Sequence, residues 1–119
     1  YIENEEHCSP MMQSKIVEAW AQSESYALSI YHTASKMLAG GSIGSESSLG
    51  KIFWSELDHM MHQTALKILG ASAELSNSSE HDAAQWIKGF MFSYGGPIYA
   101  GTNEIQKNII AERLLGLPK

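Results

Sequence analysis

Apolar residues recur every three or four positions along most of the chain, the spacing of one face of an α-helix. The first such stripe follows Ser9-Pro10, a favourable N-cap and first-turn pair, and ends at Gly40-Gly41. A second stripe runs over residues 46–69 and is wider than one helix face. That width predicts a long helix that is buried against two neighbours rather than one.

Two shorter helices are predicted downstream of a Ser- and Asn-rich loop. The third covers about residues 81–94, and Gly95-Gly96-Pro97 ends it. The fourth starts after Gly101-Thr102 and ends at Gly116. Four helical segments without a convincing strand predict an all-α fold, an up-down four-helix bundle.

The length of the first helix gives a hint about shape. At 1.5 Å per residue it would be roughly 45 Å long, whereas a compact chain of this size has a radius of gyration of only ~13–14 Å. The bundle is therefore expected to be elongated, or to need other surfaces that cover it.

Composition narrows the class of protein. The 119 residues carry a net charge of −5 and no basic cluster, which argues against nucleic-acid binding. No apolar run approaches ~20 residues, so no membrane-spanning helix is expected. The single cysteine, Cys8, fits a reducing compartment, and we expect the cytoplasm. We interpret residues 1–119 as one helical domain with an N-terminal extension (1–9) that resembles the start of a cut fragment.

The most informative segment joins the third and fourth predicted helices. Thr102 can cap the fourth helix with its hydroxyl, and the free amides at that end could bind a phosphate or a ribose hydroxyl. Gly101 would let a ligand approach the backbone closely. The same features also fit a plain helix N-cap after a loop.

This segment resembles the closing signature of flavin-dependent acyl-CoA dehydrogenases. From Tyr99 to Pro118 the sequence is YAGTNEIQKNIIAERLLGLP, close to the family pattern Tyr-x-Gly-Thr-x-(Glu/Gln)-Ile followed by Asn-Ile-Ile-Ala-Glu-Arg. The resemblance extends over about residues 10–118. Residues 48–51 and 54–57 are most similar to members that act on bulky acyl-CoAs in actinobacteria.

The resemblance implies the C-terminal domain of an FAD-dependent acyl-CoA dehydrogenase, with the first family helix missing. The complete enzyme would oxidise an acyl-CoA substrate between its α and β carbons, in fatty acid metabolism, and pass electrons to an electron-transfer flavoprotein. The domain would contact FAD, pack against the remaining N-terminal part of the enzyme, and build a homo- or hetero-oligomer. The 119 residues alone are expected to be inactive.

The family's site residues carry over only in part. Gly101, Thr102 and Glu104 match positions that contact FAD. Ala100 occupies the position where many members have the catalytic Glu, and a methyl group accepts no proton, so no catalytic residue is assigned within this chain. Some relatives place that Glu on the first family helix instead. The alternative is a non-catalytic scaffold subunit in a hetero-oligomer.

Other chemistry is less favoured by the residues. Glu56, His59 and His62 have helical spacing suited to a metal, but a di-metal bundle needs two such units, so no metal is expected. Cys8 has no recognisable partner for nucleophilic catalysis. The three tryptophans are expected to be packing anchors: Trp20, Trp54 and Trp86.

Overall fold

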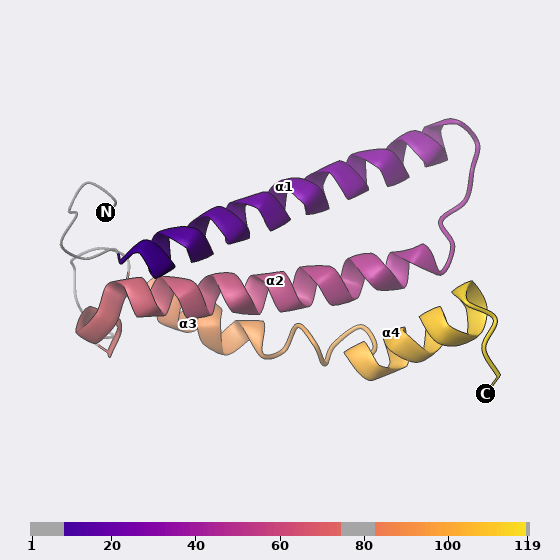
Figure 1. The fold of residues 1–119 in the computed structure, drawn as a ribbon. Helices are drawn as coiled ribbons and strands as arrows, with labels where there is room; N and C mark the ends of the chain where they lie inside the picture. Colours follow the sequence, from indigo (N-terminus) through magenta and orange to yellow (C-terminus); the bar gives the residue numbers. More distant parts are fainter. Residues whose placement is uncertain (1–8, 75–82, 119) are drawn as a thin grey trace.

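The computed structural model describes residues 9–74 and 83–118, which form four α-helices and no strand (Figure 1). The helices are α1 (Pro10–Leu38), α2 (Glu46–Leu69), α3 (Ala83–Ser93) and α4 (Asn103–Ile109). A short 3-10 helix (Gly70–Glu74) follows α2, and a π-helical turn (Ile110–Leu114) continues α4. The expected all-α class is confirmed, and the two long helices have the expected bounds.

Local signals in the sequence explain where the helices begin and end. The Ser9 side chain accepts a hydrogen bond from the Met12 amide at 3.3 Å, and Pro10 occupies the first turn of α1. After α1, Gly40 has a φ of 84°, a left-handed conformation that costs glycine nothing. At the other end of the molecule, the Thr102 side chain caps α4 by accepting from the Ile105 amide.

Helix α2 lies in the middle of the molecule (Figure 1). Helix α1 packs antiparallel along one side of α2. On the other side, α3, the following turn and α4 form a nearly continuous rod that also runs antiparallel to α2. The wide apolar stripe of α2 thus contacts neighbours on two sides, as its pattern predicts.

The buried residues are few, and most are polar. Among the described residues, Leu57 is the one buried large apolar side chain, whereas the buried polar residues number five: Ser48, Ser55, Thr64, Ser93 and Asn103. Every buried side-chain nitrogen and oxygen of the described residues has a hydrogen-bond partner. The contact between α2 and the α3–α4 rod therefore depends on small polar residues as much as on apolar burial.

Helix α1 is the least covered element. It contributes no buried residue, and its contacts with α2 include the stacked rings of Tyr26 and Phe53, whose centroids lie 6.0 Å apart. Five large apolar side chains of α1 are exposed within about a quarter of the helix circumference: Val17, Trp20, Leu28, Tyr31 and Leu38. We call this set the α1 stripe. Trp20, expected as a packing anchor, is 65% exposed here.

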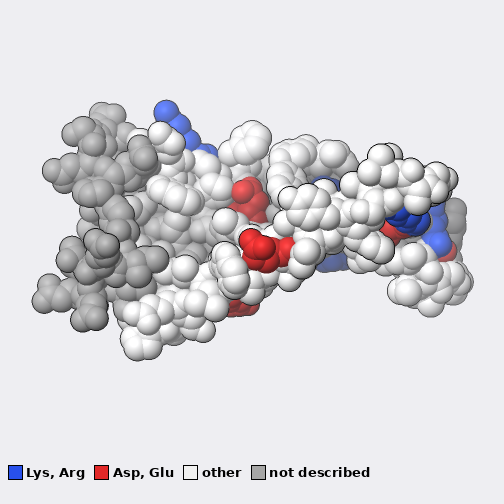
Figure 2. All heavy atoms as spheres, turned by 90° about the horizontal axis from the view of Figure 1, so that it is seen from above, with Lys and Arg blue, Asp and Glu red and all other residues white. Residues whose placement is uncertain are grey.

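Viewed from the α1 side, the surface is mostly uncharged, with acidic side chains near its middle (Figure 2). The molecule measures 50 × 26 × 25 Å, and its radius of gyration of 17.8 Å exceeds that of a compact chain. The expected elongation is confirmed. No helix in the described part of the chain is long and apolar enough to cross a membrane.

Gly89 lies in the interior of α3, where helix propensity alone would favour alanine by about 1 kcal/mol. Its missing side chain leaves room for the His62 ring of α2, and a Cβ at position 89 would overlap the ring atom Nε2. The ring cannot move freely, because its Nδ1 donates to the Asp58 carbonyl at 2.8 Å and its edge contacts Trp86. This glycine is therefore a packing residue between α2 and α3.

We predict that Gly89→Ala lowers the free energy of unfolding by about 1 kcal/mol, because overpacking exceeds the gain in helix propensity. Chemical denaturation measures the change. The control is the same substitution in a His62→Ala background, where the methyl group has space and should raise stability. A stabilising Gly89→Ala in the wild-type background would contradict the packing argument.

Candidate functional site

The segment between α3 and α4 is a series of tight turns, and it positions the predicted site. The amides of Ile98 and Tyr99 both donate to the Gly95 carbonyl, at 2.9 and 3.0 Å. The backbone then enters the left-handed region at two successive residues, Ala100 (φ 55°) and Gly101 (φ 86°). The chain folds back locally there, while α3 and α4 keep the same overall direction, and it enters α4 through the Thr102 cap.

Gln106 braces this reversal from the first turns of α4. Its side-chain Nε2 donates to the Ala100 carbonyl at 3.1 Å. A Cβ at position 101 would lie 2.7 Å from that nitrogen and would displace the Gln106 amide, and the φ of 86° favours glycine at this position. Ala100 has a Cβ, and the left-handed conformation costs an L-residue roughly 1–2 kcal/mol of conformational free energy. Strain of this kind persists only where the surrounding contacts hold it.

The amides at the start of α4 have partners within the chain. The Asn103 amide donates to the Pro97 carbonyl at 2.9 Å, and the Ile105 amide to Thr102 Oγ1 at 3.3 Å. The proximity of its own backbone amide and of the Thr102 hydroxyl lowers the pKa of the Glu104 carboxyl. The expectation of free amides at this end is thus wrong for Asn103 and Ile105, whose amides are satisfied by the Pro97 carbonyl and the Thr102 hydroxyl.

Asn103 connects this turn to α2. Its side-chain Oδ1 accepts from Lys51 Nζ at 2.7 Å, and its Nδ2 donates to Ser55 Oγ at 3.1 Å. Ser55 is fully buried, and a Cβ on Gly96 would lie 3.2 Å from the Ser55 Cβ. Small residues on both sides therefore let the turn approach α2 closely. Trp54 adds a tilted ring contact with Tyr99 at a centroid distance of 6.0 Å.

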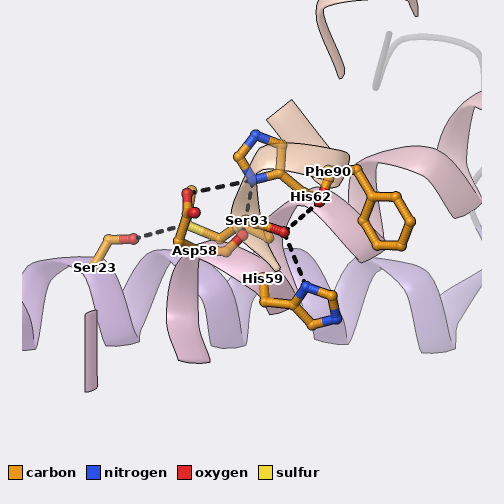
Figure 3. Close-up of polar contacts among 7 residues, drawn as sticks. Ser23, Asp58, His59, His62, Phe90 and Ser93 are labelled. Carbon is orange, nitrogen blue, oxygen red and sulfur yellow. Dashed lines mark hydrogen bonds and ion pairs between the residues drawn. The ribbon is translucent and has the colours of Figure 1, made fainter. Parts of the chain in front are cut away.

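Further along α2, two histidines make separate contacts (Figure 3). His59 Nδ1 lies 2.9 Å from Ser93 Oγ, whose own hydrogen is donated to the Phe90 carbonyl at 2.6 Å. Since a hydroxyl has one hydrogen, His59 Nδ1 must be the donor in this pair. His62 Nδ1 donates to the Asp58 carbonyl and lies 3.3 Å from the Asp58 carboxylate. The two rings serve the α2–α3 contact.

The candidate metal ligands do not converge. Glu56 is exposed, and His59 and His62 are directed at different partners (Figure 3). Within residues 9–74 and 83–118, no group of three or more His, Cys, Asp or Glu side chains could hold a metal ion. Cys8 lies outside the described residues.

The residues that hold the turn in place were not identified from the sequence. Ser55, Ser93 and Asn103 are short polar side chains of ordinary types, and nothing in their local pattern marks them as buried. One signal was available: Lys51, Ser55 and His59 follow each other at intervals of four, which places three polar residues on one side of α2.

Comparison with known proteins identifies the family. Residues 8–115 match the acyl-CoA dehydrogenase C-terminal domain. The chain belongs to this family. It is 29% identical over 113 residues to the acyl-CoA dehydrogenase IpdE1 of Mycolicibacterium smegmatis. The aligned region covers 92% of this chain and 26% of the relative. It is also 29% identical over 113 residues to IpdE1 of Mycobacterium tuberculosis, covering 92% of this chain and 28% of the relative.

The chain therefore spans about a quarter of the length of the curated relatives it matches. No solved structure matches the chain significantly. Within the family's domain, the signature segment is the α3–α4 turn with α4, and it contains each site residue that the resemblance indicated: Gly101, Thr102 and Glu104, with Ala100 beside them.

We predict that Ala100→Gly raises the free energy of unfolding by about 0.5 kcal/mol, because relief of the left-handed strain exceeds the entropy gained by the unfolded chain. Gly101→Ala should lower it by about 1–2 kcal/mol. Urea denaturation measures both. The control is Ala21→Gly on the exposed side of α1, which should cost about 1 kcal/mol. Equal losses for the two alanine-to-glycine variants would disprove the strain at position 100.

Proposed function

We propose that this chain supplies FAD contacts and subunit-packing surface to an FAD-dependent acyl-CoA dehydrogenase. The proposal rests on family membership and on the braced turn that presents Gly101, Thr102 and Glu104 next to one another. The substrate of the whole enzyme would be an acyl-CoA thioester, which is oxidised between its α and β carbons.

The chemistry of the turn indicates which part of FAD it suits. Glu104 is exposed and its carboxylate is ionised at neutral pH, since the nearby backbone amide and Thr102 hydroxyl lower a pKa that is already acidic. An ionised carboxylate accepts hydrogen bonds from hydroxyl groups and repels phosphate. With the nearby amides already bonded, the turn fits a ribose hydroxyl better than the pyrophosphate. The Gly101 position, without a side chain, allows close approach to the backbone.

The flavin, when bound, supplies the acceptor for the hydride that leaves the β-carbon. The base that takes the α-proton is a separate matter, because Ala100 offers only a methyl group. We place this base on another part of the enzyme, beyond these 119 residues, and expect these residues alone to be inactive.

The alternative is a non-catalytic scaffold subunit in a hetero-oligomeric acyl-CoA dehydrogenase, and Ala100 is the observation that favours it. The protein at its natural length distinguishes the two. Turnover of acyl-CoA by that protein without a second type of subunit would exclude the scaffold, and turnover only after a different subunit is added would support it.

The proposed partners are the N-terminal part of the enzyme, further subunits, an electron-transfer flavoprotein and the acyl-CoA substrate, in the cytoplasm. The α1 stripe supports the presence of packing partners. Its members would cost free energy if left in water, at about 25 cal/mol per Å² of apolar surface, and large apolar side chains that are exposed together on one side of a helix are typical of interfaces.

We predict that Glu104→Gln and Thr102→Val each weaken FAD binding about tenfold, because the first replaces a charged acceptor by a neutral amide and the second removes the hydroxyl. Quenching of flavin fluorescence on titration of the apoprotein measures the affinity. Glu24→Gln, on the exposed surface of α1, is the matched control and should bind FAD as the wild type does. Unchanged affinity in both turn variants would exclude these residues from the FAD site.

We also predict that the protein forms dimers or larger species at micromolar concentration, because a lone chain leaves the α1 stripe in contact with water. Sedimentation velocity measures the assembly state. Trp20→Gln should shift the distribution toward the monomer. Sedimentation as a monomer alone would contradict the prediction.

A further inference from the structure

A chain of hydrogen bonds joins α2 to the residue between the two proposed FAD contacts. Lys51 Nζ donates to Asn103 Oδ1 at 2.7 Å, Asn103 Nδ2 donates to Ser55 Oγ at 3.1 Å, and Ser55 Oγ donates to the Ile52 carbonyl at 3.0 Å. Each hydrogen is used once, so the chain is internally consistent. We call it the Asn103 chain.

The Asn103 chain is well shielded from water. Ser55 is completely buried and Asn103 is 5% exposed, while Lys51 is half-buried and keeps its ammonium at the end of the chain. Hydrogen bonds are stronger in such surroundings, and one with a charged donor is stronger than a neutral one. Lys51 therefore provides the strongest link of the three.

Asn103 is also held through its backbone, whose amide donates to the Pro97 carbonyl at 2.9 Å. Side chain and backbone together fix one residue between α2 and the turn. Thr102 and Glu104 are its immediate neighbours along the chain, and their side chains are half-buried and exposed, respectively. The placement of these two side chains thus depends on the placement of Asn103.

We infer that Lys51 is a positioning residue of the proposed site: it holds the Asn103 amide and thereby orients the turn that carries Thr102 and Glu104. Lys51 itself need not touch the ligand. The effect of Lys51 on FAD binding rests on the proposed function. The effect of Lys51 on the order of the turn can be tested without any ligand.

The experiment uses the protein at its natural length and compares Lys51→Met, which keeps the bulk but removes the donor, with Lys51→Arg, which restores a charged donor. Lys51→Gln is a milder variant in case Lys51→Met does not fold. Lys67→Met is the control, because Lys67 lies on the exposed surface of the same helix. Hydrogen exchange of peptides covering 97–106 is measured first, and FAD affinity second.

We expect exchange of the 97–106 amides to rise about tenfold in Lys51→Met, to return toward the wild-type rate in Lys51→Arg, and to stay unchanged in Lys67→Met. Exchange in α1 should not change in any variant. FAD affinity should fall about tenfold in Lys51→Met and recover in Lys51→Arg.

Two results would overturn the inference: unchanged exchange at 97–106 in Lys51→Met, or an equal rise across all four helices, which would make Lys51 a general stabiliser of the fold. If exchange changes as expected but the wild-type protein fails to bind FAD, the proposed function fails while the orienting role of Lys51 stands. If exchange changes and FAD binds with equal affinity to every variant, the positioning role at the FAD site is excluded.

Discussion

The close approach between α2 and the turn before α4 is the contact on which the rest of the structure depends. It is possible because the facing residues are small: Ser55 on α2 lies against Gly96, and Asn103 bonds to the Ser55 hydroxyl. A larger apolar residue at position 55 would push the turn away and leave the side-chain Nδ2 of Asn103 without its Ser55 partner in a dry environment. Such unpaired polar groups are costly, which makes the register between α2 and the α3–α4 rod specific.

The close contact between α2 and the turn leaves the protein stabilised by buried polar contacts with few buried apolar side chains among the described residues. In the α2–α3 contact, His59 is hydrogen-bonded to Ser93, and His62 packs against Gly89. Leu57 is the one large apolar side chain that is buried among the described residues. Polar contacts contribute specificity but little net free energy. Much of the apolar surface instead faces outward on α1, so the surface available for burial lies where further protein would pack.

The same geometry explains the properties of the candidate site. With Asn103 held against α2, the chain makes a local reversal at Ala100 and Gly101 before it enters α4, and Gln106 braces that reversal. The reversal also places the Pro97 carbonyl near the Asn103 amide. The start of α4 is therefore a satisfied cap with an exposed, ionised Glu104, and its remaining hydrogen-bonding capacity is that of an acceptor.

The sequence alone determined the all-α class and the bounds of the two long helices, because caps, glycine stops and apolar periodicity act within a few residues. The resemblance of residues 99–118 to a family signature indicated the family. The signature around Thr102 also marked the candidate turn. Only the tertiary structure decided that Ser55 meets Asn103 and that Gly89 makes room for His62, and only it decided that the amides of α4 are paired. Some of these contacts join residues from different helices, and the others lie in a turn whose path is set by folding. Their pairing therefore depends on the register between helices, which no local sequence pattern encodes.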